Sequence, residues 1–259
     1  MIKFFRTIRQ SLLINGQTIK YLKYAFGEIV LVVIGILIAL QINNWNLDRL
    51  DRKMEKSILS DLKVEFEANL ADANRVMEGH EGMFKALFQI QENIKLKRFD
   101  NTEADSLIYS VFDWFTFTPK PGASNNLFNS GNLDLITNPE LRNLLTLWPG
   151  LVADLKDDED LTLNYTQNTI LPFLADNYPI SNVDHYVFKY YGRNDDLFPN
   201  IQNSVPVAFN AEKLFDNFNF QNHVSIKRLQ IVGILYECRA LVDAILSILS
   251  IIDQELTIK

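Results

Sequence analysis

An uncharged apolar run near the N-terminus constrains this chain more than any other feature. Residues 29–40 (IVLVVIGILIAL) contain no charged or strongly polar side chain, and the wider segment 26–43 is 18 residues long. As a helix, that segment would measure about 27 Å, close to the roughly 30 Å of a membrane's hydrocarbon layer. Tyr24 and Trp45 flank it, as in the aromatic belts of membrane helices. The pattern predicts one transmembrane helix over residues 26–45.

Two other interpretations of the apolar run compete with a retained membrane anchor. A buried core helix would also be apolar, but ten strongly apolar residues favour membrane insertion by about 4 kcal/mol, more than Glu28 costs near the interface. A cleaved signal peptide needs a short basic start and a cleavage site of small residues. Here the basic region exceeds 20 residues, and residues 40–45 offer no pair of small side chains. We therefore predict that the anchor is retained.

Residues 1–25 form a basic, amphipathic segment ahead of the predicted span. Its apolar side chains share one helical face: Ile2, Phe5, Ile8 and Leu12. This pattern predicts either a helix lying in the interface of an anionic leaflet or a plain basic tail. Basic residues flank both ends of the span equally, but the N-terminal tail has no acid. We therefore expect a cytoplasmic N-terminus, an inner-membrane location and a periplasmic soluble domain.

One face of the predicted span is suited to contact with another helix. It combines a carboxylate with small and apolar residues: Glu28, Leu31, Gly35, Ala39 and Ile42. Small residues four positions apart let two helix backbones approach closely in lipid. Glu28 has two alternative roles, resting at the headgroup level or taking up protons. We expect membrane lipid as one partner, together with either a second copy of the chain or the helix of another membrane protein.

Composition limits what residues 46–259 can do. Residues 1–45 hold five of the 25 basic residues and one of the 32 acidic residues, so the remainder has a net charge of −11. An acidic body argues against nucleic acid as a partner, because such binding needs clustered Lys and Arg. Cys238 is the only cysteine, so no intramolecular disulfide can form.

Helical periodicity dominates residues 47–97. Apolar side chains recur at spacings of three, four and seven: Ile58, Leu62, Phe66, Leu70, Ala73, Met77, Phe84, Leu87, Ile90 and Ile94. Gly79 and Gly82 predict a kink or a short break. No Gly or Pro lies between Leu40 and Lys56, so this helix can continue directly from the span.

Turn and cap residues divide the next part of the chain. A helix over residues 102–116, with Leu107, Val111, Trp114 and Phe115 as its apolar side chains, is expected to end at Thr118-Pro119. Asn138-Pro139 predicts an N-cap and the first turn of another helix. We expect Pro149-Gly150 to interrupt that helix, which then resumes to about residue 176.

The C-terminal part combines an irregular region with a long helix. Residues 177–209 are the least regular, and residues 186–191 (YVFKYY) are compatible with a short strand. A final helix over residues 218–256 is expected to point these side chains inward: Leu229, Val232, Leu235, Tyr236, Leu241, Leu246 and Leu249. The predicted fold is mainly α, with one N-terminal transmembrane helix followed by an antiparallel helical bundle and an irregular loop region.

No pattern of catalytic, metal-binding or cofactor-binding residues stands out. The three histidines, His80, His185 and His223, lack the spacing of metal ligands. The acidic run 157–160 lacks the Gly and ligand spacing of a calcium loop, so we expect a solvated face. Ser130 lacks the glycine frame of a nucleophile elbow, and residues 125–132 are expected to form a structural corner rather than a binding loop. We predict no catalytic residue, no metal site and no cofactor.

Three blocks of the sequence are distinctive: Gly27–Trp45, Ser130–Arg142 and Ile251–Leu256. They resemble an uncharacterised family of bacterial single-pass membrane proteins common in the Bacteroidota. The resemblance implies a membrane location and no particular activity. Where it leads us to expect an aromatic pair, the chain has Trp148-Pro149, a departure that concerns the helix after residue 140.

Two classes of function are compatible with these observations. The first is a membrane-anchored, non-enzymatic scaffold, adaptor or sensor that acts through protein–protein contacts. The second is a membrane-anchored enzyme with a carboxylate-based site in residues 177–209. A buried cluster of ionisable side chains lining a pocket would favour the enzyme. We expect the first class.

Overall fold

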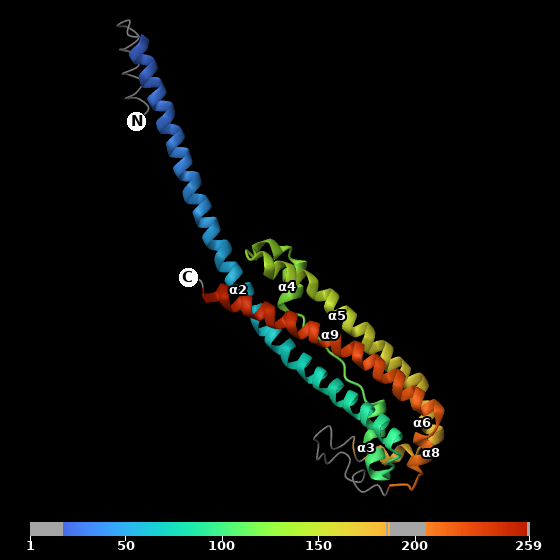
Figure 1. Cartoon of the computed structure of the whole chain (residues 1–259). Coiled ribbons are helices and arrows are strands. Elements are labelled where there is room, and N and C mark those ends of the chain that lie inside the picture. Colours follow the sequence, from blue (N-terminus) through green and yellow to red (C-terminus); the bar gives the residue numbers. More distant parts are fainter. Residues whose placement is uncertain (1–17, 185, 187–205, 258–259) are drawn as a thin grey trace, which may run out of the picture. The chain divides into compact units, whose positions relative to one another are not determined.

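The described part of the chain is built from helices. A computed structural model describes residues 18–184, 186 and 206–257, and every regular element among them is a helix. The elements are α2 (Thr18–Leu96), α3 (Asn101–Phe112), α4 (Ala123–Asn129), η1 (Asn132–Leu135), α5 (Pro139–Tyr165), η2 (Thr166–Ile170), α6 (Leu171–Asn177), η3 (Ile180–Val183), α8 (Ala211–Phe215) and α9 (Phe218–Thr257) (Figure 1). The chain divides into two compact units, Met1–Ser57 and Ile58–Lys259. The prediction of a mainly α fold is confirmed.

The first unit contains the N-terminal part of α2. Among the residues described, α2 is the one helix long and apolar enough to cross a membrane, and none of its most apolar 18-residue window is buried within the chain. Large side chains such as Leu31 and Ile42 are exposed there. Exposure of apolar surface to water costs about 25 cal/mol per Å², so an apolar environment would stabilise such a helix. The predicted apolar helix is present and supports a membrane anchor.

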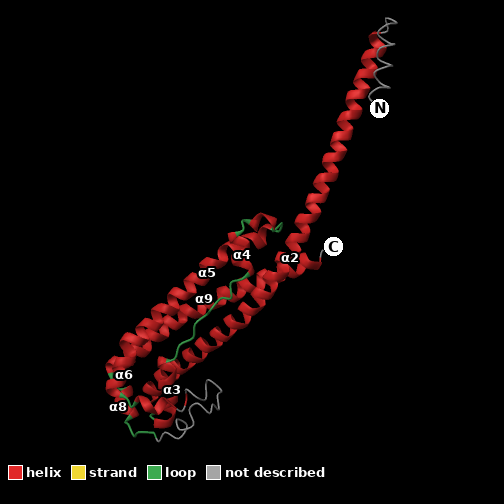
Figure 2. Cartoon of the chain, turned by 180° about the vertical axis from the view of Figure 1, so that it is seen from behind, coloured by secondary structure: helices red, strands yellow, loops and turns green. Residues whose placement is uncertain are grey.

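In the second unit, α9 runs in the opposite direction to α5. The amide of Asn138, just before α5, donates to Glu255 near the end of α9 over 3.0 Å. At the other end of α5, the Tyr165 hydroxyl lies 2.8 Å from Nδ1 of His223, near the start of α9. Both ribbon views show the two helices side by side along their length (Figures 1 and 2).

The C-terminal part of α2 also runs opposite to α9. Nζ of Lys63 lies 2.7 Å from Oδ1 of Asp253, and farther along α2 the Gln91 amide donates to Ser225 Oγ over 3.2 Å. Because α5 and this part of α2 both run against α9, they run parallel to each other.

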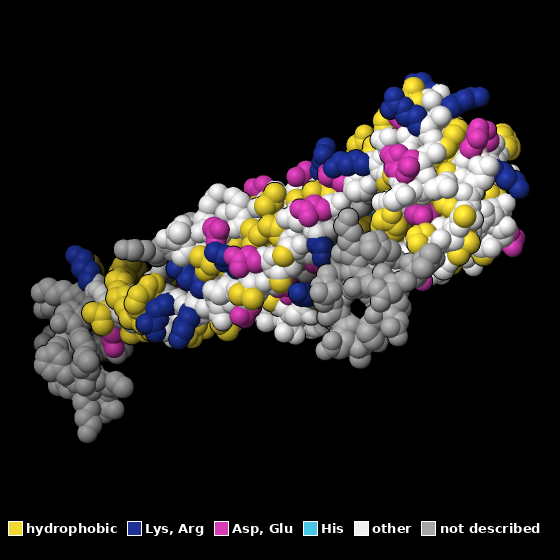
Figure 3. Space-filling view, turned by 90° about the horizontal axis from the view of Figure 1, so that it is seen from below, with side chains coloured by type: hydrophobic (Ala, Val, Ile, Leu, Met, Phe, Trp, Pro, Cys, Tyr) yellow, Lys and Arg dark blue, Asp and Glu magenta, His cyan; other side chains and the backbone are white. Residues whose placement is uncertain are grey.

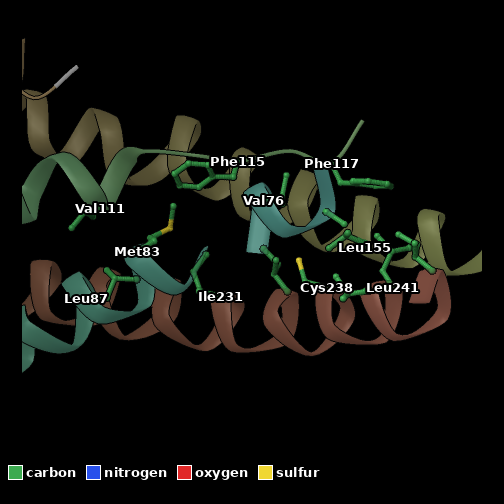
Figure 4. Packing of buried hydrophobic residues seen from close by; sticks show 14 of the residues in the cluster. Val76, Met83, Leu87, Val111, Phe115, Phe117, Leu155, Ile231, Cys238 and Leu241 are labelled. Carbon is green, nitrogen blue, oxygen red and sulfur yellow. The ribbon is translucent and has the colours of Figure 1, made fainter. Parts of the chain in front are cut away.

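Apolar side chains from all these helices form one core in the second unit. Residues of α2, α3, α5 and α9 meet there, including Leu87, Val111, Leu155 and Ile231 (Figure 4). Fully burying a Leu, Ile or Phe side chain contributes roughly 1.5–3 kcal/mol, so this core is the main source of stability. The Phe66 and Trp148 rings meet edge-on at 5.0 Å between centroids.

Two predicted helix breaks are wrong. Helix α2 continues through Gly79 and Gly82 to Leu96. Gly79 has a packing role, because a Cβ there would lie 2.4 Å from the Phe115 ring. Helix α5 continues through Pro149, whose missing N–H would be expected to weaken it. Burial of Leu145 and Trp148 before the proline, and Leu155 after it, outweighs that cost of about 3 kcal/mol.

Helix α3 ends earlier than predicted. Asp113 is already extended, with φ −66° and ψ 159°, so the helix stops at Phe112 instead of residue 116. As a result Phe115 is buried, whereas Trp114, predicted to belong to the apolar face, is exposed. The N-cap predicted at Asn138 is confirmed, since its side chain accepts from the N–H groups of Glu140 and Leu141.

The buried face of α9 differs from the predicted one. Its bounds match the prediction closely, but Leu229, Tyr236 and Leu246 are exposed rather than inward. Leu241 is buried as predicted, and the other buried side chains follow a neighbouring stripe that includes Val224, Lys227, Ile231, Ile234 and Cys238. In the region expected to be irregular, Tyr186 is helical, and the rest of the strand suggested for residues 186–191 lies outside the described residues.

Candidate functional site

An extended segment lies between α3 and α4, and its backbone is bound by side chains. Residues 113–121, here called the strap, contain no regular secondary structure (Figure 2, green). An extended chain packed on helices has no neighbouring strand to pair with, so its N–H groups need other acceptors. In this structure side chains of α2 and α5 supply them.

Three acceptors lie on one face of α2. Three backbone N–H groups donate to them: Thr118 to Asp72 over 3.1 Å, Lys120 to Asn69 over 2.8 Å and Gly122 to Glu65 over 2.7 Å. Acceptors spaced by four and three residues share a helix face, while donors spaced by two share one side of an extended chain. The two periods match over this stretch, so α2 binds the strap in one register.

Glu65 binds more than one donor. Besides Gly122, its carboxylate accepts from the backbone N–H of Ser124 over 3.1 Å and from the Ser124 hydroxyl. Ser124 lies in the first turn of α4, where N–H groups have no partner within the helix. Glu65 therefore fixes the end of the strap and the start of α4 together.

The first half of the strap is bound inside the core. The Glu159 carboxylate of α5 accepts from the Phe117 N–H over 3.0 and 3.2 Å. Nζ of Lys227 in α9 donates to the Asp113 carbonyl over 3.1 Å and to the Thr166 hydroxyl over 2.8 Å. Two ionisable side chains from different helices therefore bind the strap backbone at its buried end.

These contacts belong to a buried polar cluster. We define it by residues from α2, the strap, α5, η2 and α9: His80, Asp113, Glu159, Thr162, Thr166 and Lys227. All six line a cavity of about 10 Å³, together with apolar side chains such as Met83, Phe115 and Ile231 (Figure 4). This volume is about that of one water molecule, so the cluster cannot hold an organic substrate as it stands.

Burial controls the electrostatics of the cluster. The Lys227 side chain is 0% exposed, and this burial lowers its pKa to about 7, an effect partly opposed by the Asp113 carboxylate. Burial also raises the pKa of Asp113, against the stabilising N–H of Trp114 and the Lys227 ammonium. The cluster can therefore change its protonation near neutral pH, which is its clearest chemical property.

A π-helical turn lies beside the cluster. Residues Thr166–Ile170 form the π turn η2, and Thr166 supplies the hydroxyl that Lys227 binds. A π turn inserts an extra residue into the helix, so the side chains before and after it are rotated relative to each other. Here it leaves both Thr166 and Ile170 buried, one against the polar cluster and one in the core.

Another buried acid, Asp105, lies on α3. A cavity of about 420 Å³ is lined by Asp105, Asn182 and Tyr186, among others. The Asp105 carboxylate accepts from the Tyr178 hydroxyl and from the Asn182 amide. Burial, together with this bond, raises the pKa of Tyr178. With these partners, Asp105 holds together segments that are far apart in sequence.

The sequence-predicted packing face lies on α2. Leu31 and Ile42 are exposed, and a Cβ added at Gly35 would meet nothing within 4 Å. Glu28 and Ala39 lie on the same helix, in the first unit. These observations leave the face open to another helix, but its pairing stays a prediction.

The other predicted positions have mixed outcomes. In the acidic run 157–160, Glu159 is buried rather than solvated, because it accepts from Phe117. Residues 125–132 contain most of α4 and a left-handed Gly131 (φ 70°), and with Ile58 and Asp61 they line a cavity of about 490 Å³. His223 bonds Tyr165, and His185 lies outside the described residues. Within the described ranges, no group of three His, Cys, Asp or Glu is placed to hold a metal ion.

Sequence reasoning missed Lys227 and Glu159. The signal that could have found them is their position within apolar stripes. Lys227 follows Val224 by three residues and precedes Ile231 by four, while Glu159 follows Leu155 by four. A charged side chain in an apolar stripe has two explanations: either it is buried together with the stripe, or that stripe faces solvent and another face of the helix is buried. Helix α9 has two apolar faces, so both explanations were open.

The comparisons with known proteins give one match. Residues 28–148 match the model of a family of unknown function, DUF6090. This supports the uncharacterised family that the sequence resemblance implied, and the matched range includes the strap and its three acceptors on α2. Glu159 and Lys227 lie beyond it. No curated protein and no solved structure matches the chain.

Proposed function

We propose that this chain is a membrane-anchored, non-enzymatic scaffold, adaptor or sensor that acts through protein–protein contacts. In this proposal the apolar part of α2 is a single-pass anchor in a bacterial inner membrane, and the second unit is an antiparallel helical bundle in the periplasm. The observation that carries it is an open apolar groove on the second unit. Exposed apolar surface of this kind marks interaction sites in soluble domains.

The groove lies between α2 and α9. It has a volume of about 200 Å³ and is lined by Met77, Glu81, Phe84, Val232, Leu235, Tyr236 and Arg239. Tyr236 is 72% exposed and nearby Leu229 is 66% exposed, so the core does not use these side chains. The face of the molecule in Figure 3 shows hydrophobic side chains intermixed with acidic and basic ones.

The charges at the groove favour a second copy of the chain as its occupant. Glu81 comes from α2 and Arg239 from α9, so the groove carries one charge of each sign. In a two-fold dimer every contact occurs twice: if residue i of one copy contacts residue j of the other, then residue j of the first copy also contacts residue i of the second. Glu81 of one protomer can then pair with Arg239 of its partner on both sides of a shared apolar centre.

A charge exchange tests this proposal on the full-length chain in mild detergent. Glu81→Arg and Arg239→Glu each place like charges across the dimer, so each should weaken association at least tenfold in light scattering. The double variant restores opposite charges and should associate like the wild type. Lys95→Glu, an exposed position on α2 away from the groove, is the matched control. Equal association of all four variants would overturn the proposal.

The enzyme alternative has less support among the described residues. Asp195 and Asp196, two carboxylates of the region named for that site, lie outside the described residues. The nearby Asp105 already accepts hydrogen bonds from Tyr178 and Asn182, and the cluster around Lys227 has room for only about one water molecule. We therefore retain the non-enzymatic proposal.

A further inference from the structure

The small cavity of the buried polar cluster has hydrogen-bonding groups without partners. His80 is 2% exposed, and neither of its ring nitrogens has a hydrogen-bond partner. The nearest acid oxygen is Oε1 of Glu159, 3.9 Å from Nε2, which is beyond hydrogen-bonding distance. The Thr162 hydroxyl, from the next turn of α5, is buried and also unpartnered. Both residues line the same cavity.

The other members of the cluster already have partners. Glu159 accepts from the Phe117 N–H, and Lys227 donates to Asp113 and Thr166. The Phe115 ring packs edge-on to His80 at 5.6 Å between centroids, so it closes one side of the imidazole without bonding its nitrogens. Buried polar groups in folded proteins almost always have partners. The missing partner for His80 and Thr162 must therefore reach them through the cavity.

The lining of the cavity selects the chemical class of this partner. A cation would meet the Lys227 ammonium, and no group of three His, Cys, Asp or Glu among the described residues is placed to hold a metal ion. An anion would meet the Glu159 carboxylate. The volume of about 10 Å³ admits one water-sized molecule and nothing larger. A neutral molecule that both donates and accepts satisfies all these conditions.

We propose that this cavity binds one water molecule, hydrogen-bonded to a ring nitrogen of His80 and to the Thr162 hydroxyl. The water joins α2 to α5 in the core and completes the polar cluster. A neutral imidazole has one donor and one acceptor nitrogen, so water can pair with either. This site is independent of the groove between α2 and α9.

A substitution that keeps the shape of Thr162 and removes its hydroxyl tests the proposal. With water bound, Thr162→Val breaks a satisfied hydrogen bond, so the Tm of the full-length chain should fall by about 2–4 °C. In a dry cavity, Thr162→Val would instead remove an unpaired buried hydroxyl, and the Tm would rise. Thr166→Val is the matched control, because its hydroxyl is bonded to Lys227 and its loss should lower the Tm in either case.

A direct observation of the water completes the test. In a sample labelled with ¹⁵N-histidine, the His80 imidazole should show a cross-peak to a slowly exchanging water, assigned by its loss in His80→Gln. The same cross-peak should be lost or weakened in Thr162→Val and retained in Thr146→Val, which changes an exposed threonine of α5 outside the cavity. A rise in Tm for Thr162→Val, or the absence of the cross-peak in the wild type, would overturn the proposal.

Discussion

Burial of Lys227 carries an electrostatic cost, because a charged side chain loses its hydration there. Its ammonium is fully buried and is bonded to two neutral oxygens, the Asp113 carbonyl and the Thr166 hydroxyl. Neutral acceptors compensate a buried charge less well than a carboxylate does. The side chain consequently loses its proton more readily than a lysine in water, and the stability of the fold is linked to pH.

Lys227→Met should remove part of this pH dependence. The pKa of Lys227 is about 7 in the folded chain, against 10.5 in an unfolded one. Between these values the unfolded state binds more protons, so the free energy of unfolding of the wild type rises with pH, by up to about 1.4 kcal/mol per unit. Denaturant unfolding of the full-length chain at pH 7, 8 and 9 measures this rise. The methionine variant should show a flatter profile.

The pH range and the control variant are chosen so that the change in slope of the free energy of unfolding against pH reports on Lys227. Burial raises the pKa of Cys238 from 9.0 to about 12, so this thiol begins to lower stability as the pH approaches 9, equally in the wild type and in Lys227→Met, and lowers it fully above 9. Measurements therefore stop at pH 9. Lys156→Met removes an exposed lysine paired with Asp160, and it should keep the wild-type slope. An unchanged slope in Lys227→Met would contradict the assignment.

The strap gives the second unit a connection that is neither helix nor sheet. Its backbone is held by side chains of α2 and α5, and its Phe115 ring packs against Gly79 of α2. Gly79 and Gly82 are neighbours on the same helix but have different surroundings. The strap covers the first, whereas a Cβ added at the second would meet nothing within 4 Å.

Gly79→Ala and Gly82→Ala should therefore change stability in opposite directions. At residue 79 the new methyl group would lie 2.4–2.6 Å from three atoms of the Phe115 ring, which is buried and cannot move freely. We expect a loss of about 1–3 kcal/mol. At residue 82 the alanine improves helix propensity and should add roughly 0.5–1 kcal/mol. Thermal unfolding compares the two, and Gly79→Ala with Phe115→Leu should recover part of the loss.

Glu65→Ala should loosen the strap at its other end. The substitution leaves the N–H groups of Gly122 and Ser124 without their carboxylate, and each charge-assisted bond contributes about 1.5–3 kcal/mol. We expect a loss of several kcal/mol in unfolding experiments and faster amide exchange at residues 118–124. Glu67→Ala, at an exposed position two residues away, is the control and should be nearly neutral. Similar exchange in the two variants would refute the role of Glu65.

Helices whose ends are marked by adjacent cap residues can be predicted from the sequence, whereas the extended strap cannot. Asn138-Pro139 begins α5 because its cap is formed by adjacent residues. The extended conformation of residues 113–121 depends on acceptors at Asp72 and Glu159, more than 40 positions away in sequence for both. No local pattern reports such partners, so the helix was extended to residue 116.

Helix α9 shows a second limit of periodicity. Apolar residues occur on more than one of its faces, so spacing alone does not tell which face is buried. The prediction selected Leu229 and Tyr236, whereas the core uses Ile231, Ile234 and Cys238. The same ambiguity hid Lys227, since its neighbours in the stripe were not identified as buried. The extra apolar face is what leaves a groove beside α2.

At the scale of the whole chain, the apolar part of α2 is the feature that supports a membrane anchor. Its large side chains, such as Leu31 and Ile42, are exposed. Alkaline carbonate washing of native membranes should leave the full-length protein in the pellet. A mature chain that begins near residue 40, or a protein released by the wash, would contradict a retained anchor.

We expect the predicted contact face of α2 to act in association within the membrane. In lipid the acyl chains are as apolar as leucine, so helices associate through close packing rather than through a hydrophobic drive. A Cβ at Gly35 would meet nothing within the chain, and Ala39 lies one turn farther along, so another helix can approach closely at this face. Interhelical polar contacts contribute only about 0.6 kcal/mol on average, so packing should matter more than the Glu28 carboxylate.

Gly35→Ile should therefore weaken association in detergent more than Glu28→Gln, as measured by crosslinking and light scattering. Val33→Phe, five residues after Glu28 and so on the opposite side of the helix, is the control and should leave association unchanged. Equal behaviour of all three variants, with no copurifying membrane protein, would reduce the predicted face to ordinary lipid contact.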